Sequence, residues 1–409
     1  MKSYNVYVDS ANWLCEPNLV GYSMIDRYVI ENGHKIIENP SEADYIIINS
    51  CGFTKDHEED TINLFNKLYS KKEEKATIII AGCLLKINKK LIDSLDVTPI
   101  DFNEGKKFDE IFFKTKKFEL IKPYCDTGRY EDQFLKKNLT DPLKIVQIQL
   151  TRLMLPFSKK LKKNYQKITD DVAIKNKILV EIGKGCASNC KYCVIRKSKG
   201  NIHSREITDI IEDIKKTYDP AKELFLVADD CSCYGMDNNT KLIDLFSEIK
   251  KNFPDLLIDL DNINPCWLEK YPDEYIKLFS ENNISYATIP IQSGSNKIIK
   301  DMNRIYDIEK TISIIKKIKK AAPQTALNTH LIICYPNENF IDFLKSLYAS
   351  LFFDFTIVFV YSAPNESSSS DFSHFKSRFA RNYRLTFFVL FQNFVTFYKL
   401  IKLPIKKKK

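Results

Sequence analysis

The sequence predicts an α/β protein made of an N-terminal α/β domain with a parallel sheet, followed by a partial (β/α)6 barrel. Three short apolar runs, 4–8, 45–48 and 77–81, are separated by polar segments of helical length, a pattern typical of parallel strands joined by helices. From residue 178 to residue 361, strand-like runs alternate with helix-like segments in about six units. The 409 residues are enough for two or three hydrophobic cores, so both parts can be accommodated.

The composition indicates a large protein of a reducing compartment. Of the residues, 44% are apolar, and 62 Lys and Arg against 53 Asp and Glu give a net charge of +9. Lysine is frequent along the whole chain, so the basic balance alone is weak evidence for a nucleic-acid partner. The start Met1–Asn5 lacks the apolar stretch of a signal peptide, and the 11 cysteines therefore predict metal ligands in a cytoplasmic protein rather than disulfide bridges.

Each of the three N-terminal apolar runs leads into a cysteine. Cys15 follows the first run, Cys51 the second and Cys83 the third. Because the carboxyl ends of parallel strands meet at one edge of a sheet, we expect these three thiols to converge there and to hold one metal cluster. The alternative for each single position is a buried cysteine with no role in binding, since cysteine is common in protein cores.

A second group of three cysteines follows the apolar run 178–180. Cys186, Cys190 and Cys193 have the spacing CX3CX2C within a loop-like segment. Thiolates are soft ligands, and three of them suit a [4Fe–4S] cluster that keeps one iron open for another molecule. A zinc site without a nearby fourth ligand and three unpaired loop cysteines are the alternatives.

This spacing, with Tyr192 just before the third cysteine, resembles the signature of the radical S-adenosylmethionine (SAM) enzymes. In that family the open iron chelates SAM, and one electron cleaves SAM to a 5′-deoxyadenosyl radical. The segments 49–53 and 82–84 are similar to the N-terminal domain of the methylthiotransferases within this family, in which three cysteines hold an auxiliary [4Fe–4S] cluster. The Cys-Gln-x-Asn motif of that domain appears here with Glu16 in place of glutamine. The resemblance covers about residues 5–100 and 178–365.

The resemblance also implies where SAM would be bound. Segment 289–295 is similar to the family motif Pro-x-Gln-Ser-Gly-Ser, 302–304 matches Met-Asn-Arg, and 234–237 matches Tyr-Gly-x-Asp. Polar groups at the carboxyl ends of barrel strands face the mouth, where they could bind SAM, and an arginine could pair with its carboxylate. The predicted SAM contacts are Tyr192, Asp230, Gln292, Ser293 and Arg304. A surface cation is the alternative for the arginine.

The sequence departs from the family pattern in three places. The proline and arginine that the family usually has after the cysteine loop are here Arg196 and Lys199. Both glycines of a Gly-Phe-Pro-Gly-Glu turn are replaced in segment 334–338. Cys231 and Cys233 stand where the family has small or hydroxyl-bearing residues, and we expect this pair to serve packing rather than metal binding.

Four segments organise the chain. We expect residues 105–175 to be a basic linker, whose part 147–168 forms either a solvated helix or a docking surface for an acidic partner or a membrane. The apolar stretch near the C-terminus is interrupted by polar side chains, which argues against a transmembrane segment and favours a helix packed across the barrel, with a membrane-surface helix as the alternative. No room remains for the terminal β-barrel with which family members bind substrate. The predicted segments are the α/β domain 1–104, the linker 105–175, the radical SAM barrel 176–370, and the C-terminal helix and basic tail 371–409.

The resemblance predicts a methylthiotransferase with two [4Fe–4S] clusters and SAM, acting on a protein, a peptide or tRNA. The phenylalanine after Cys51-Gly52 slightly favours the family branch that modifies a ribosomal protein over the branch that modifies tRNA. A flavodoxin or ferredoxin is the expected reductant. The alternatives are a radical SAM enzyme for a specialised peptide or small molecule, in which the auxiliary cluster only transfers electrons, and a scaffold that has lost activity.

Overall fold

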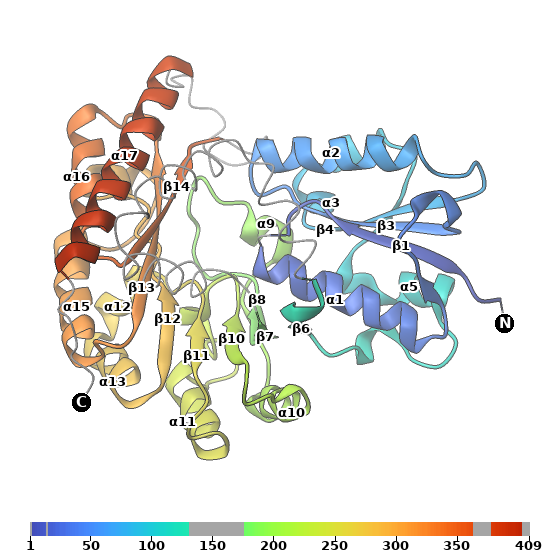
Figure 1. Cartoon of the computed structure of the whole chain (residues 1–409), viewed down its shortest axis with the longest axis horizontal. Coiled ribbons are helices and arrows are strands. Elements are labelled where there is room, and N and C mark those ends of the chain that lie inside the picture. Colours follow the sequence, from blue (N-terminus) through green and yellow to red (C-terminus); the bar gives the residue numbers. More distant parts are fainter. Residues whose placement is uncertain (1, 14, 131–175, 363–377, 403–409) are drawn as a thin grey trace.

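The structure is a computed structural model of the whole chain (Figure 1). The basic segment 147–168, for which a linker helix or a docking surface is expected, lies outside the residues that the structure describes. Those described residues are 2–13, 15–130, 176–362 and 378–402.

The N-terminal part is a parallel five-stranded sheet between two layers of helices, in the strand order β2-β1-β3-β4-β5. Its strands are β1 (Asn5–Ser10), β2 (Lys35–Ile36), β3 (Tyr45–Ser50), β4 (Thr77–Gly82) and β5 (Thr98–Ile100). Its helices are α1 (Glu16–Glu31), α2 (Lys55–Tyr69), α3 (Leu84–Ile87), α4 (Lys89–Asp93) and α5 (Gly105–Phe112). Ile46 and Ile48 of β3 pack towards α2, whereas Ile47 packs towards α1 and α5, so both faces of the sheet are buried.

The second part is a seven-stranded sheet in the order β14-β13-β12-β11-β10-β7-β6. Six of its strands are parallel, which confirms the predicted partial barrel, and the edge strand β6 is antiparallel to β7. The strands are β6 (Tyr124–Asp126), β7 (Lys177–Glu181), β10 (Glu223–Val227), β11 (Ile258–Leu260), β12 (Ile284–Thr288), β13 (Ala326–Ile333) and β14 (Phe355–Val360). The helices are α9 (Ile195–Lys199), α10 (Ile207–Thr217), α11 (Leu242–Asn252), α12 (Pro265–Lys270), α13 (Pro272–Glu281), α14 (Asn296–Asp301), α15 (Ile308–Ala321), α16 (Phe340–Ser350) and α17 (Arg378–Lys402).

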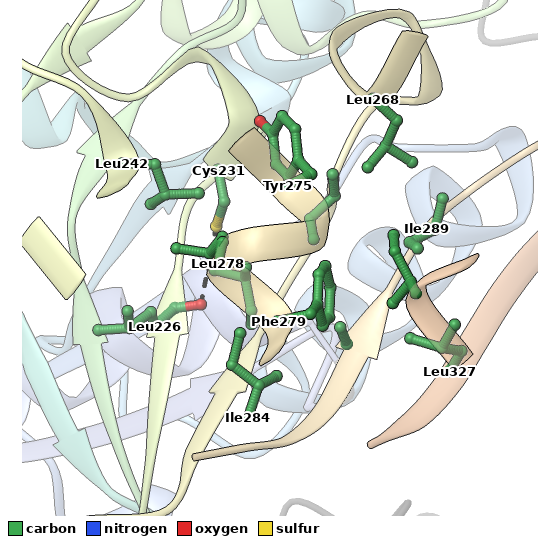
Figure 2. Packing of buried hydrophobic residues seen from close by; sticks show 14 of the residues in the cluster. Leu226, Cys231, Leu242, Leu268, Tyr275, Leu278, Phe279, Ile284, Ile289 and Leu327 are labelled. Carbon is green, nitrogen blue, oxygen red and sulfur yellow. Dashed lines mark hydrogen bonds between the residues drawn. The ribbon is translucent and has the colours of Figure 1, made fainter. Parts of the chain in front are cut away.

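One hydrophobic core fills the space between this sheet and its outer helices. Figure 2 shows Leu226 of β10, Leu278 and Phe279 of α13 and Ile284 of β12 within it. The Cys231 thiol lies in the same cluster and is 3.7 Å from the carbonyl oxygen of Leu226, to which it donates. This position agrees with the packing role expected for Cys231.

A second core joins the two parts of the molecule. Leu179 of β7, together with Phe225 and Val227 of β10, packs in the core that contains α1 rather than in the core beneath α10 and α11. Figure 1 shows α1 beside β7 and β10. The N-terminal part is therefore seated on the inner face of the barrel sheet.

Residues 105–130, which the sequence assigned to the linker, are part of this arrangement. Helix α5 buries Phe108 and Phe112 in the core that α1 shares, and β6 extends the barrel sheet. The helix has only eight residues and the strand only three, so neither produces a recognisable periodicity in the sequence.

The turn after β13 keeps its backbone shape without the family's glycines. Cys334 has φ = 62° and Asn337 has φ = 65°, so both adopt the left-handed conformation. The backbone N–H of Cys334 donates to the Glu338 carboxylate at 2.7 Å, which holds the turn closed. A buried carboxylate thus supports a conformation that glycine would adopt without strain.

The same carboxylate anchors the C-terminal helix. Arg384 of α17 forms a buried ion pair with Glu338, and Phe388 of the same helix is buried against the barrel. Burial raises the pKa of Glu338 to about 7, and the Arg384 charge acts in the opposite direction. Helix α17 packs on β13 and β14, as expected of a helix across the barrel. None of the described helices has the length and apolar character needed to span a membrane.

Replacing Arg384 by methionine should destabilise the fold by about 3–5 kcal/mol, because the Glu338 carboxylate would stay buried without a partner. Arg381, which is partly exposed one turn earlier in α17, provides the control, and Arg381→Met should change the free energy of unfolding by less than about 0.5 kcal/mol. Urea unfolding of the apoprotein measures both. Equal effects of the two substitutions would contradict the anchoring role of Arg384.

Candidate functional site

The three N-terminal cysteines lie at one edge of the five-stranded sheet. Cys51 directly follows β3, Cys83 directly follows β4, and Cys15 immediately precedes α1 in the connection from β1. Strands β1, β3 and β4 are neighbours and parallel, so their carboxyl ends lie side by side. The backbone N–H of Cys51 donates to the Thr61 hydroxyl at 3.2 Å, which fixes the start of the loop. The structure thus brings the three thiols together.

Burial governs the chemistry of these thiols. It raises the pKa of Cys51 to about 11 and also raises the pKa values of Cys15 and Cys83. The thiols also interact electrostatically with one another, Cys15 with both others and Cys51 with Cys83. Three thiols that oppose one another's ionisation are stabilised as thiolates only when a positive centre lies between them, which is what a metal cluster supplies.

The second cysteine group lies in a tight loop after β7. Strands β8 (Gly183–Lys184) and β9 (His203–Ser204) close the loop at its base. Gly185 has φ = 79°, and a side chain there would lie 2.2 Å from the Asn201 carbonyl oxygen, so the loop requires glycine at this position. The loop is tied to the Met-Asn-Arg turn, because Asn303 donates to the Asn189 carbonyl oxygen at 2.7 Å.

The three thiols of this loop differ in how the protein shifts their pKa values. The Cys186 thiol has a lowered pKa, chiefly because it accepts a hydrogen bond from Cys233, and the N–H of Ser188 lies 3.3 Å from its sulfur. Burial raises the pKa values of Cys190 and Cys193, and each of these thiols interacts electrostatically with Cys186. The loop therefore also gathers three sulfur atoms around one space.

The donor set of both groups fits an iron–sulfur cluster. Within the described ranges, no three His, Cys, Asp or Glu side chains are grouped so that they could hold one metal ion. A structural zinc site usually has four protein ligands around one ion, whereas each of these groups offers three thiols. Each iron of a cubane cluster takes its own thiolate, so three soft donors spaced around a shared volume suit such a cluster.

Three of the predicted SAM contacts form one network at the barrel mouth. Arg304 donates to the Tyr192 hydroxyl and to the Asn264 side-chain oxygen, both at 2.8 Å. The Asn264 amide lies 3.5 Å from the Asp230 carboxylate, which in turn is 3.8 Å from the sulfur of Cys186. Among the described residues, the buried Nε of Arg304 has no hydrogen-bond partner. A guanidinium group in this state is suited to an anionic ligand.

The other two predicted contacts lie after β12. Gln292 is buried and has φ = 57°, a strained conformation for a residue that is not glycine, and its backbone pairs with β13. The Ser293 hydroxyl is fully buried, 3.3 Å from the Ser346 hydroxyl, and it accepts from the Ser295 N–H at 3.2 Å. The hydrogen bonds of Ser293 thus connect the strand end to α16, and its role as a SAM contact stays a prediction.

Sequence reasoning missed the contacts that Cys233, Asp229 and Lys199 make at this site, and the packing role expected for Cys233 leaves out its place beside a cysteine of the loop. Cys233 is buried and lies within hydrogen-bonding distance of Cys186 and 3.2 Å from the Asp230 carboxylate. Asp229 accepts from the Gly185 N–H at 2.9 Å and pairs with Lys199 at 2.9 Å. The sequence singled out Cys233 as part of an unusual cysteine pair and Lys199 in the position of a family arginine. It could not give their partners, because these contacts join residues far apart in the chain.

A three-cysteine loop after the first parallel strand of a partial barrel defines a radical SAM enzyme. The family model described as "Radical SAM superfamily" matches residues 180–347, and the model described as "Uncharacterized protein family UPF0004" matches residues 8–100.

Curated relatives match most of the chain. It is 30% identical to the ribosomal protein uS12 methylthiotransferase RimO of Clostridium perfringens, over 85% of this chain and 73% of that protein. It is 25% identical to a probable threonylcarbamoyladenosine tRNA methylthiotransferase of Pyrococcus horikoshii, over 84% of this chain and 72% of that protein. The chain belongs to the radical SAM methylthiotransferase family.

A solved structure supports the fold. The cobalamin-dependent SAM radical enzyme OxsB superposes with a TM-score of 0.50 at 11% identity. The match covers 95% of this chain and 56% of that chain, so this protein spans little more than half of its length. At this identity the likeness concerns the fold alone.

Arg304→Met should weaken SAM binding about 10- to 100-fold, because a charge-assisted hydrogen bond contributes about 1.5–3 kcal/mol. Lys300→Met is the control, because it removes an exposed cation one turn earlier in the chain. Equilibrium dialysis of the reconstituted protein with labelled SAM measures both. Unchanged SAM affinity in Arg304→Met would contradict the predicted contact with SAM and would limit the role of Arg304 to positioning the cysteine loop.

Proposed function

We propose that this chain is a radical SAM methylthiotransferase that replaces an unactivated C–H bond of a protein, peptide or tRNA by C–S–CH3. The observation that supports this most is the presence of two thiol triads, one next to the strand ends of the N-terminal sheet and one in the loop after β7, in a molecule whose two parts share a core. One triad is enough for a radical SAM enzyme. The second triad is what sulfur insertion requires and ordinary radical chemistry does not.

The chain's own residues would hold both centres. Cys186, Cys190 and Cys193 would bind the radical SAM cluster, and Cys15, Cys51 and Cys83 the auxiliary cluster. When bound, the two clusters and two SAM molecules supply a hydrogen-abstracting radical and a methylated sulfur atom.

The residues around the first cluster would orient SAM. Arg304 would pair with its carboxylate, and Asp230 would accept hydrogen bonds from its amino or ribose hydroxyl groups. Gln292 would offer a neutral side chain at the next strand end.

The substrate class follows from the relatives' chemistry and is part of the proposal. The curated relatives are described as modifying a ribosomal protein or tRNA. The segment Cys51-Gly52-Phe53 slightly favours a protein substrate over tRNA. We further propose a flavodoxin or ferredoxin as the electron donor and the cytoplasm as the location, because free thiols and open clusters persist in reducing compartments.

Anaerobically reconstituted protein should hold about eight irons, as expected for two cubane clusters, and the triple variant C15A/C51A/C83A about four. The control C125A, which removes a buried cysteine outside both triads, should retain about eight. Iron and sulfide analysis with Mössbauer spectroscopy measures the cluster content.

The product decides between the proposed activity and its rival. Wild-type protein should transfer one methylthio group to a ribosomal-protein peptide or to tRNA, detected by mass spectrometry, whereas the triple variant should still cleave SAM without transferring sulfur. Two clusters without any methylthiolated product would favour an auxiliary cluster that only transfers electrons. About four irons in both wild type and triple variant would contradict the proposal.

A further inference from the structure

The residues directly after each cysteine group meet between the two parts of the molecule. Helix α9 begins two residues after Cys193, and α3 begins directly after Cys83. The two short helices pack against each other, and Figure 1 shows α9 between the N-terminal sheet and the barrel. The end of the radical SAM loop therefore lies against the auxiliary triad.

Two side chains of α9 reach the auxiliary triad. The Ser198 hydroxyl is hydrogen-bonded to the Cys83 thiol, and Ser198 is 7% exposed. The Lys199 side chain is 21% exposed, and its ammonium group is 2.9 Å from the Asp229 carboxylate at the end of β10. The second oxygen of Asp229 accepts from the Gly185 N–H at 2.9 Å, so the cation is fixed to the base of the radical SAM loop.

Lys199 is a positive charge that acts on all three thiols of the auxiliary triad. Burial is the largest influence on the pKa of each thiol and raises it, and the Lys199 charge lowers the pKa of all three. At Cys83 the effect of Lys199 is larger than the opposing effect of Asp229. Lys199 belongs to α9, which packs on α3 directly after Cys83, so its charge lies on the side of α9 that faces the N-terminal part.

We propose that Lys199 is a positioning residue of the auxiliary centre, whose ammonium group makes the cluster held by Cys15, Cys51 and Cys83 easier to reduce. The inference rests on the proposed function, because it requires that the N-terminal triad holds a cluster. Reduction adds one electron from a low-potential donor and neither forms nor breaks a bond. The added negative charge is stabilised by a nearby fixed cation in a partly buried site, where screening by water is weak.

The test uses a background in which only the auxiliary centre can form, the variant C186A/C190A/C193A. In this background, K199M should lower the midpoint potential of the cluster, measured by a dithionite titration followed by electron paramagnetic resonance. K199R should restore the potential towards that of the parent, because it restores the charge. K197M is the matched control, because Lys197 is an exposed cation of the same helix, and it should leave the potential unchanged.

The iron content separates failure of this role from failure of the proposed function. About four irons in every variant, with equal potentials for K199M, K199R and K197M, would overturn the role of Lys199 and leave the auxiliary cluster intact. No iron in the parent variant would overturn the auxiliary cluster and, with it, this role. Loss of iron in K199M but not in K199R would support a requirement for the charge, whereas loss in both would show a packing role and overturn the proposal.

Discussion

The packing of α1 on the inner face of the barrel sheet is the constraint on which the site depends. Leu179, Phe225 and Val227 leave the core beneath the outer helices and are buried against α1 instead. Since Cys15 stands at the start of α1, this contact determines where the N-terminal thiols lie relative to the barrel mouth. The proposed function requires both triads to act on one substrate, and the hydrophobic interface holds the two sheets in a fixed relation that would allow this.

The packing of the two parts buries acidic side chains between them, which disfavours their charged forms. Burial raises the pKa of Glu16 to about 7, and the Asp261 carboxyl near it has a pKa well above its usual range for the same reason. Glutamate at this position is therefore closer to its neutral form than a surface carboxylate would be, and so resembles the glutamine usual in the family. The Lys177 charge acts in the opposite direction and lowers the pKa of Glu16.

The sequence predicted most of the fold because its signals are local. Apolar runs such as 45–48 became strands, and cysteines after such runs could be placed at strand ends by the geometry of parallel sheets alone. Strand β6 was not predicted, since three residues give no pattern and its partner β7 lies about 50 residues further along the chain.

The candidate site was predicted less completely. Motif positions such as Arg304 could be carried over from the family, but the partners of such residues could not. The contacts of Lys199 with Asp229 and of Cys233 with Cys186 join separate elements of the fold, and only the folded chain brings them together. Ser293 is a motif residue for which the sequence predicted a contact with SAM. In the structure its hydroxyl lies within hydrogen-bonding distance of the Ser346 hydroxyl, a partner inside the protein that the motif did not indicate.

The most direct test of the account is the magnetic interaction between the two centres. Electron paramagnetic resonance spectra of the dithionite-reduced wild type would be compared with the sum of the spectra of the two single-triad variants, C15A/C51A/C83A and C186A/C190A/C193A. Two clusters facing one reaction space should broaden each other's signals and speed spin relaxation beyond that sum. A wild-type spectrum equal to the sum would contradict the claim that both triads serve one site.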